Sequence, residues 1–193
     1  TTTVGLIGDD IVVLAADKRA TAGFYIAHKK VKKIAKLSDR IAMTISGVVA
    51  DAQALIDILR GEIKYYEMVS NNKISVKAVA TIASNVIFSY SKTFPYLVQL
   101  IIAGYDVKPR IFVLDPYGTS TEEQYIATGS GSPIALGVIE AEYKPNLSEK
   151  ELVELAVKSI SAALKRDVAS GEGIDVVSIS KSGIKEYPTF KIA

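Results

Sequence analysis

The first 47 residues alternate between short apolar runs and polar turns, which is the pattern of β-hairpins. Gly8-Asp9-Asp10 separates two apolar runs, and Ser38-Asp39-Arg40 separates two more. Small polar residues of this kind favour tight turns between antiparallel strands. The sequence therefore predicts four strands, over residues 2–7, 11–16, 31–37 and 41–46.

The hydrophobic period then changes from two to between three and four, as in amphipathic helices. One such stretch has apolar residues at positions 52, 55, 59, 63 and 66. A second begins at Ser75, a favourable N-cap, and has apolar residues at positions 79, 82, 86 and 90. Two consecutive helices are expected here.

The remainder repeats this order. Strands are predicted over residues 98–105, 110–115 and 121–128, followed by a helix over 132–143 with Pro133 in its first turn. Ser148 and Glu151 have capping-box spacing and begin a fourth helix that extends to residue 164. Two last strands, 174–180 and 184–190, flank a turn at residues 181–183.

The order is thus strands, two helices, strands, two helices, strands. Strands linked by hairpins are antiparallel, which argues against a doubly wound parallel sheet. We expect an α+β fold, a four-layer α-β-β-α sandwich of two antiparallel sheets with a helix pair outside each. Because no linker or repeat interrupts the chain, residues 1–193 are interpreted as one domain.

Composition restricts the chemistry. The chain has no cysteine and a single histidine, His28, which excludes thiolate zinc sites, multi-histidine metal sites and a thiol nucleophile. We therefore expect no metal and no cofactor. A Ser-His-Asp triad could use only His28, so a base other than histidine is expected if this chain is a hydrolase. The net charge of +2 gives no reason to expect a nucleic-acid partner, and no apolar run is long enough to suggest a membrane partner. A cytoplasmic location is expected.

Thr1 is the first candidate nucleophile. On its own, an N-terminal threonine is more simply explained by removal of an initiator Met than by catalysis. A hydroxyl is nevertheless a usable nucleophile when a base lies beside it, and an α-amine that titrates near ~8 can be that base. Such a site needs no histidine.

Asp17 and Lys33 are further candidate site residues, although each could more simply be a charged side chain exposed to solvent. Asp17 closes an apolar run, and Lys33 lies in a basic run from His28 to Lys36. In a strand, however, Lys33 would share a face with Val31 and Ala35. A lysine on an inward face needs a carboxylate partner.

Three glycine-containing segments could place backbone groups near such a site. Residues 128–132, Thr-Gly-Ser-Gly-Ser, lack the third glycine of a dinucleotide-binding loop and read as a plain turn, although a phosphate cradle is an alternative. Ser46-Gly47 ends a strand just before a helix, where free N–H groups can bind an anion. Residues 166–171, Arg-Asp-Val-Ala-Ser-Gly, follow the fourth helix and read as a helix stop.

Taken together and in order, these segments resemble the proteasome β subunits of archaeal type, from residue 1 to about residue 181. The motifs are Thr1-Thr-Thr-Val-Gly5, Asp17-Lys-Arg-Ala-Thr21, Lys32-Lys33, Ser46-Gly47 with Asp51-Ala52-Gln53, the 128–132 loop and the 166–171 segment. A bacterial peptidase of the HslV type is similar in the first half but lacks the last segment. Proteasome α subunits share the fold but lack the terminal threonine.

The resemblance implies a threonine endopeptidase of the N-terminal-nucleophile hydrolase fold that is cut from a precursor immediately before Thr1. The catalytic positions that it implies are Thr1, Asp17, Lys33, Gly47, Ser130, Asp167 and Ser170. Thr1 would attack with its own amine as base, Lys33 and Asp17 would activate its hydroxyl, and the Gly47 N–H would stabilise the oxyanion. The last three residues would position the amine.

The resemblance also implies the substrate-binding positions Ala20, Thr21, Val31, Ala35, Ile45, Gly47, Val49 and Gln53. Thr21 and Gly47 would align the substrate as an extended strand. The other positions would form a mostly small, apolar and uncharged specificity pocket, with Ile45 restricting its depth. Cleavage after hydrophobic residues is predicted.

The implied partners are α subunits and other β subunits, of the same or a second type, in stacked seven-membered rings. An ATPase regulator and unfolded protein substrates are implied as well. The main alternative is a noncatalytic or weakly active β subunit that serves ring assembly or activates a neighbouring β subunit. An amidohydrolase of the same fold and a nucleotide-binding module are more distant alternatives.

Overall fold

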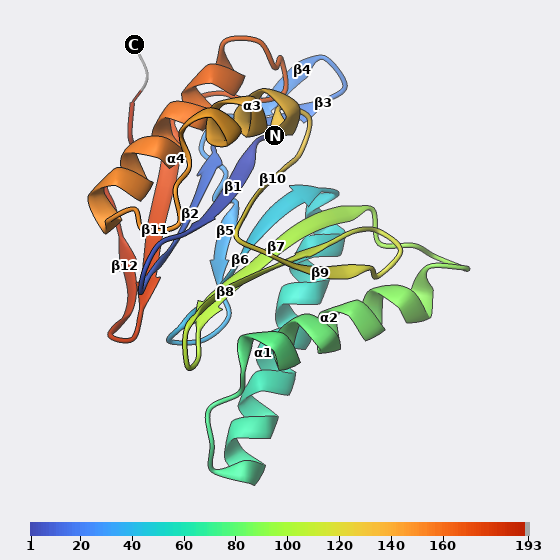
Figure 1. The fold of residues 1–193 in the computed structure, drawn as a ribbon. Coiled ribbons are helices and arrows are strands. Elements are labelled where there is room, and N and C mark those ends of the chain that lie inside the picture. Colours follow the sequence, from blue (N-terminus) through green and yellow to red (C-terminus); the bar gives the residue numbers. More distant parts are fainter. Residues whose placement is uncertain (192–193) are drawn as a thin grey trace.

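The computed structural model describes residues 1–191, which form two antiparallel five-stranded sheets stacked face to face (Figure 1). The first sheet has the order β10-β1-β2-β11-β12. Its strands are β1 (Thr3–Ile7), β2 (Val12–Asp17), β10 (Tyr125–Thr128), β11 (Ile174–Ser180) and β12 (Gly183–Glu186). The second sheet has the order β5-β6-β7-β8-β9. Its strands are β5 (Ile34–Lys36), β6 (Ile41–Gly47), β7 (Val98–Tyr105), β8 (Pro109–Leu114) and β9 (Ser120–Glu123).

Two helices cover the outer face of each sheet, as Figure 1 shows. The helices α3 (Ser132–Glu142) and α4 (Glu149–Leu164) pack on the first sheet, and α1 (Val49–Ser70) and α2 (Val76–Tyr90) pack on the second. A third apolar cluster, which includes Leu14, Ile101 and Ile111, fills the space between the sheets. The α-β-β-α sandwich predicted from the sequence is confirmed.

Helix boundaries follow from local sequence. The Ser75 side chain accepts a hydrogen bond from the Ala78 N–H at the start of α2. The predicted capping box of α4 is present, with Ser148 and Glu151 exchanging side-chain and backbone hydrogen bonds. Asn71 adopts a left-handed conformation at the end of α1, which asparagine tolerates better than most residues.

The segment predicted as one strand over residues 121–128 is two strands in different sheets. β9 pairs with β8 in the second sheet, and β10 pairs with β1 in the first. The chain therefore crosses between the sheets at Gln124, and this crossing carries the glycine loop after Thr128 to the beginning of β1.

Three other boundaries differ from the sequence prediction. The strand expected over 31–37 is confined to β5, because the Val31 N–H bonds to the Lys18 carbonyl outside the second sheet. A short hairpin, β3 (Ala20–Ala22) and β4 (Tyr25–His28), was not predicted. The strand expected over 184–190 ends at Glu186, after which Phe190 forms only an isolated bridge with Ile174. Among the described helices, none is long and apolar enough to cross a membrane.

Candidate active site

Strand pairing brings the start of the chain against two other strand ends. Thr3 of β1 is opposite Ala16 of β2 on one side and Thr128 of β10 on the other. Thr1 therefore lies beside Asp17, where β2 ends, and beside the loop that begins at Gly129. Ile45 N–H donates to the Lys33 carbonyl, which fixes Lys33 alongside β6 and near Thr1.

Lys33 joins the hydroxyl of Thr1 to a buried carboxylate. Its Nζ lies 3.0 Å from Thr1 Oγ1 and 2.7 Å from Asp17 Oδ1. Asp17 is fully buried, and its two oxygens also accept backbone N–H groups from Thr2, Arg19 and Gly171 at 2.9–3.0 Å. The carboxylate that the inward-facing lysine required is thus Asp17, held by four donors.

The electrostatics of Lys33 reflect two opposing effects. Burial lowers the pKa of the Lys33 ammonium, and the adjacent Asp17 carboxylate raises it, with a net decrease. A lysine with a lowered pKa releases and takes back a proton more readily than an exposed lysine. Its proton lies within hydrogen-bond distance of Thr1 Oγ1, which is the atom that a nucleophilic mechanism would need to deprotonate.

The Thr1 amine is held from the opposite side. It donates to the Ala169 carbonyl at 2.8 Å and to Ser130 Oγ at 3.1 Å, and lies 3.5 Å from Asp167 Oδ2. Burial and the Lys33 charge lower the pKa of this amine, against opposing effects of Asp17 and Asp167. A lowered pKa leaves more of the amine neutral near pH 7, which is the form that can act as a base.

Asp167 is the centre of the cluster around the amine. Its Oδ2 accepts hydrogen bonds from Ser130 Oγ at 2.7 Å and from Ser170 Oγ at 2.5 Å. Burial alone would raise the pKa of Asp167, but the hydrogen bonds from Ser170, Ser130 and the Ala169 N–H outweigh it and lower the pKa. The carboxylate is therefore ionised, and it draws both serines and the Thr1 amine together.

The 166–171 segment is fixed to the rest of the site by Arg19. The Arg19 guanidinium donates to the Val168 carbonyl at 3.0 Å and forms an ion pair with Glu172 at 3.0 Å. The Lys18 N–H bonds to the Gly171 carbonyl at 3.0 Å. The segment that sequence alone suggested as a helix stop therefore docks on the residues that follow β2.

Gly47 and Gly129 each lie so close to another part of the backbone that no side chain fits on their Cα atoms. A Cβ on Gly47, whose φ is +109°, would lie 2.2 Å from the Leu97 carbonyl oxygen. A Cβ on Gly129, whose φ is +91°, would lie 2.2 Å from the Thr1 carbonyl oxygen. Only glycine fits either position without strain.

A cavity of about 530 Å³ opens beside Thr1. The predicted substrate-binding residues in its wall are Ala20, Thr21, Val31, Ile45, Gly47 and Val49. Ala35 and Gln53 are not in this wall, since Ala35 packs against the α1–α2 core and Gln53 is exposed on α1. Leu97, Gln99 and Pro116 line the cavity and were not predicted from the sequence.

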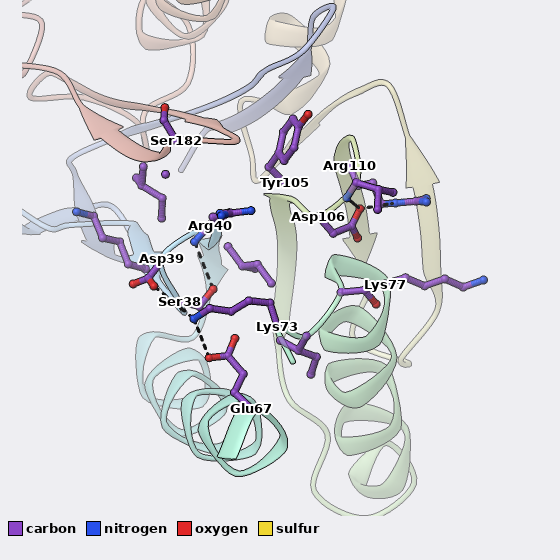
Figure 2. A pocket seen from close by; sticks show the side chains of 17 residues that line it. Ser38, Asp39, Arg40, Glu67, Lys73, Lys77, Tyr105, Asp106, Arg110 and Ser182 are labelled. Atoms are coloured by element: carbon purple, nitrogen blue, oxygen red, sulfur yellow. Dashed lines mark hydrogen bonds and ion pairs between the residues drawn. The ribbon is translucent and has the colours of Figure 1, made fainter. Parts of the chain in front are cut away.

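A larger cavity, of about 900 Å³, lies at the other end of β6, near Ile41 (Figure 2). Its charged groups are largely paired with one another. Lys73 contacts Asp39 and Glu67, and Arg110 contacts Asp106, as the dashed lines in Figure 2 mark. Thr1 is not among the residues that line this cavity, so the volume of a cavity does not by itself identify the site.

Two contacts of the site were missed by sequence reasoning. The Ala169 carbonyl accepts from the Thr1 amine, and the Thr2 hydroxyl lies 2.8 Å from Ser170 Oγ. Both join residues 168 positions apart, and no local pattern indicates them. The described residues contain no cluster of His, Cys, Asp and Glu that could hold a metal ion.

Comparison with known proteins agrees with this arrangement. A family model described as proteasome subunit matches residues 1–179. Proteasome subunit beta 2 of Aeropyrum pernix is 58% identical over 96% of this chain and 84% of its own length. Proteasome subunit beta 2 of Ignicoccus hospitalis is 57% identical over 95% of this chain and 86% of its own length. Proteasome subunit beta of Methanopyrus kandleri is 49% identical over 97% of this chain and 91% of its own length. The chain belongs to the proteasome subunit family, as a β subunit of archaeal type.

Proposed function

We propose that this chain is a catalytically active threonine endopeptidase subunit, with Thr1 as its nucleophile. The observation that supports this proposal most is that both the hydroxyl and the amine of Thr1 contact other groups of the site. Its hydroxyl faces the Lys33–Asp17 pair at 3.0 Å, while its amine is held by Ser130, Ala169 and Asp167. A threonine with a purely structural role needs neither contact.

In the proposed reaction, Thr1 Oγ1 attacks the carbonyl carbon of the scissile peptide bond. Its proton passes to the neutral Thr1 amine, while the charged Lys33 stabilises the oxygen that loses it, and is then delivered to the departing amine as the C–N bond breaks. An ester to Thr1 remains. The neutral Thr1 amine then takes a proton from water, which attacks the ester and releases the carboxylic acid and the free hydroxyl.

The remaining residues act on charge and orientation. The Gly47 N–H would donate to the oxyanion, an interaction of this kind being worth about 3 kcal/mol in other hydrolases. Asp17 keeps Lys33 in place and favours its charged form, which eases loss of the Thr1 proton. Asp167, Ser130 and Ser170 keep the Thr1 amine in one orientation.

The cavity beside Thr1 supports cleavage after hydrophobic residues. Val31, Ile45 and Val49 form an apolar part of its wall together with Ala20, whereas the charged residues Arg19, Lys32 and Lys33 line other parts of it. Ala35 and Gln53 stay part of the proposed specificity pocket, although neither lines the cavity beside Thr1.

Membership of the family implies assembly with other proteasome subunits. We propose further that the partners are α subunits and other β subunits in stacked seven-membered rings, that an ATPase feeds unfolded proteins to them, and that the particle is cytoplasmic. Enclosing the site would restrict such an unselective protease to chains threaded into the chamber.

The test compares wild-type and Thr1→Ala particles, each assembled with its partner subunits. Native mass spectrometry confirms assembly and a fluorogenic peptide ending in a hydrophobic residue reports hydrolysis. We expect T1A to assemble normally and to lose at least about 10³-fold in kcat, because no other nucleophile replaces Oγ1. An assembled wild-type particle with a free Thr1 amine and no activity would favour the noncatalytic alternative. Activity retained by T1A would place the nucleophile elsewhere.

A further inference from the structure

The second residue of the chain has its side chain enclosed in the active-site cluster. Thr2 is fully buried, and its Oγ1 lies 2.8 Å from Ser170 Oγ. A Cβ on Gly131 would lie only 2.0 Å from the same Oγ1 and 3.2 Å from Asp167 Oδ2. The Thr2 hydroxyl is therefore confined to one place, against the backbone of the 128–132 loop.

The direction of its hydrogen bond follows from the neighbours. An ionised carboxylate only accepts, so the single proton of the Ser170 hydroxyl is donated to Asp167 Oδ2, at 2.5 Å. Ser170 Oγ must then accept from Thr2, whose hydroxyl donates at 2.8 Å. The result is a directed chain from Thr2 through Ser170 to Asp167, in which each bond polarises the next.

The backbone of the same residue contacts the other half of the site. The Thr2 N–H donates to Asp17 Oδ1 at 2.9 Å, the oxygen that also accepts from Lys33. The Thr2 carbonyl accepts from the Asp17 N–H at 3.1 Å. Thr2 thus connects the carboxylate that serves the Thr1 hydroxyl with the carboxylate that serves the Thr1 amine.

We propose that Thr2 is a positioning residue for the reaction, and that its hydroxyl, through Ser170 and Asp167, fixes the Thr1 amine relative to the Thr1 hydroxyl. The proposal rests on the proposed function of Thr1. It assigns to the second residue a task beyond strand pairing: Thr2 touches no reacting atom, yet it orders the groups that do. Its loss should slow the chemical step and leave substrate binding unchanged, because the Thr2 side chain is fully buried and is not in the cavity wall.

Thr3 provides a matched control. It is also fully buried, and its Oγ1 bonds to Thr128 Oγ1 at 2.7 Å and to Thr44 Oγ1 at 3.1 Å, away from Asp167. Thr3→Val and Thr2→Val therefore each delete one buried hydroxyl, from two consecutive residues at the start of the chain. Thr2→Ser keeps the hydroxyl and deletes a methyl group. Thr2→Ala removes the hydroxyl with no demand on space, should valine prevent assembly.

The experiment measures kcat, KM and thermal stability for assembled particles of wild type and the four variants. We expect T2V and T2A to lower kcat about tenfold with KM within about twofold, T2S to recover kcat to within about threefold, and T3V to keep wild-type kcat. T3V and T2V should lose similar thermal stability, since both leave buried partners unpaired.

The inference is overturned if assembled T2V and T2A keep wild-type kcat, or if T3V lowers kcat as much as they do. It is also overturned if T2S is as slow as T2A, because packing of the methyl group would then be the cause. These outcomes are distinct from failure of the proposed function, in which the wild-type particle itself would show no hydrolysis.

Discussion

Replacing Lys33 by methionine removes the ammonium group and keeps a side chain of similar length. Asp17 then loses its one side-chain partner among residues 1–191 but keeps the backbone N–H groups of Thr2, Arg19 and Gly171. Removing one member of a buried ion pair costs about 3–5 kcal/mol. Because three donors remain on the carboxylate, we expect the lower end, about 3 kcal/mol of unfolding free energy.

The effect on catalysis should be as large as the effect on stability or larger. Thr1 Oγ1 loses a charge-assisted hydrogen bond of 3.0 Å, a type of contact worth about 1.5–3 kcal/mol. The group that would take up or stabilise the proton of the attacking hydroxyl is lost with it, a contribution of about 10²–10⁴ in rate. The expected fall in kcat is therefore about 10²–10⁴, with little change in KM.

The assay uses assembled particles well below their unfolding temperature, so that lost stability does not reduce the folded fraction. Lys30→Met is the control, because Lys30 is an exposed lysine of the same basic run. It should hydrolyse the fluorogenic peptide at the wild-type rate. If assembled K33M kept more than about a third of wild-type kcat, the role given to Lys33 would be wrong.

Other predictions concern the oxyanion donor, the base and the pocket. Gly47→Ala would place a Cβ 2.2 Å from the Leu97 carbonyl oxygen at a φ of +109°. We therefore expect kcat to fall about 10²-fold or more and the melting temperature to drop. Unchanged kinetics would contradict the role of the Gly47 N–H as oxyanion donor. Because burial and Lys33 lower the pKa of the Thr1 amine from 8.0, its neutral form persists below pH 8. Peptidase activity should therefore rise with pH through a midpoint below 8, and a midpoint at or above 8 in a kcat/KM profile would disagree. Ile45→Ala should enlarge the pocket and raise kcat/KM for a large aromatic residue relative to valine by roughly tenfold, measured with paired peptides.

Much of the fold could be predicted because its elements have strong local signals. The Gly8 and Asp39 turns, the Ser148 capping box and the change of hydrophobic period all act over a few residues. The β3–β4 hairpin has only Gly23 at its turn as a local signal, because the neighbouring apolar residues Phe24 and Tyr25 are exposed, 95% and 73%, and do not alternate with polar ones.

Some features of the candidate site could likewise be predicted from the sequence, and others could not. The need of Lys33 for a carboxylate partner follows from the cost of burying a charge, whereas the strand alternation expected around it is absent, because Lys33 lies just before β5. The choice of Asp17 as that partner, and the contacts of Thr1 with Ala169 and of Thr2 with Ser170, depend on how the sheets stack. Contacts across 168 residues have no periodicity that sequence can reveal, and only the assembled sandwich brings them together.

The most direct test of the central claim is a mass measurement after treating assembled particles with a peptide epoxyketone. This reagent closes a ring through a hydroxyl and an adjacent primary amine, so a stable adduct requires both reactive groups of one N-terminal residue. We predict one adduct per chain, located on the N-terminal peptide at Thr1 and absent from Thr1→Ala. Assembled particles with a free Thr1 amine that form no adduct, or that carry it on another residue, would contradict a catalytic Thr1.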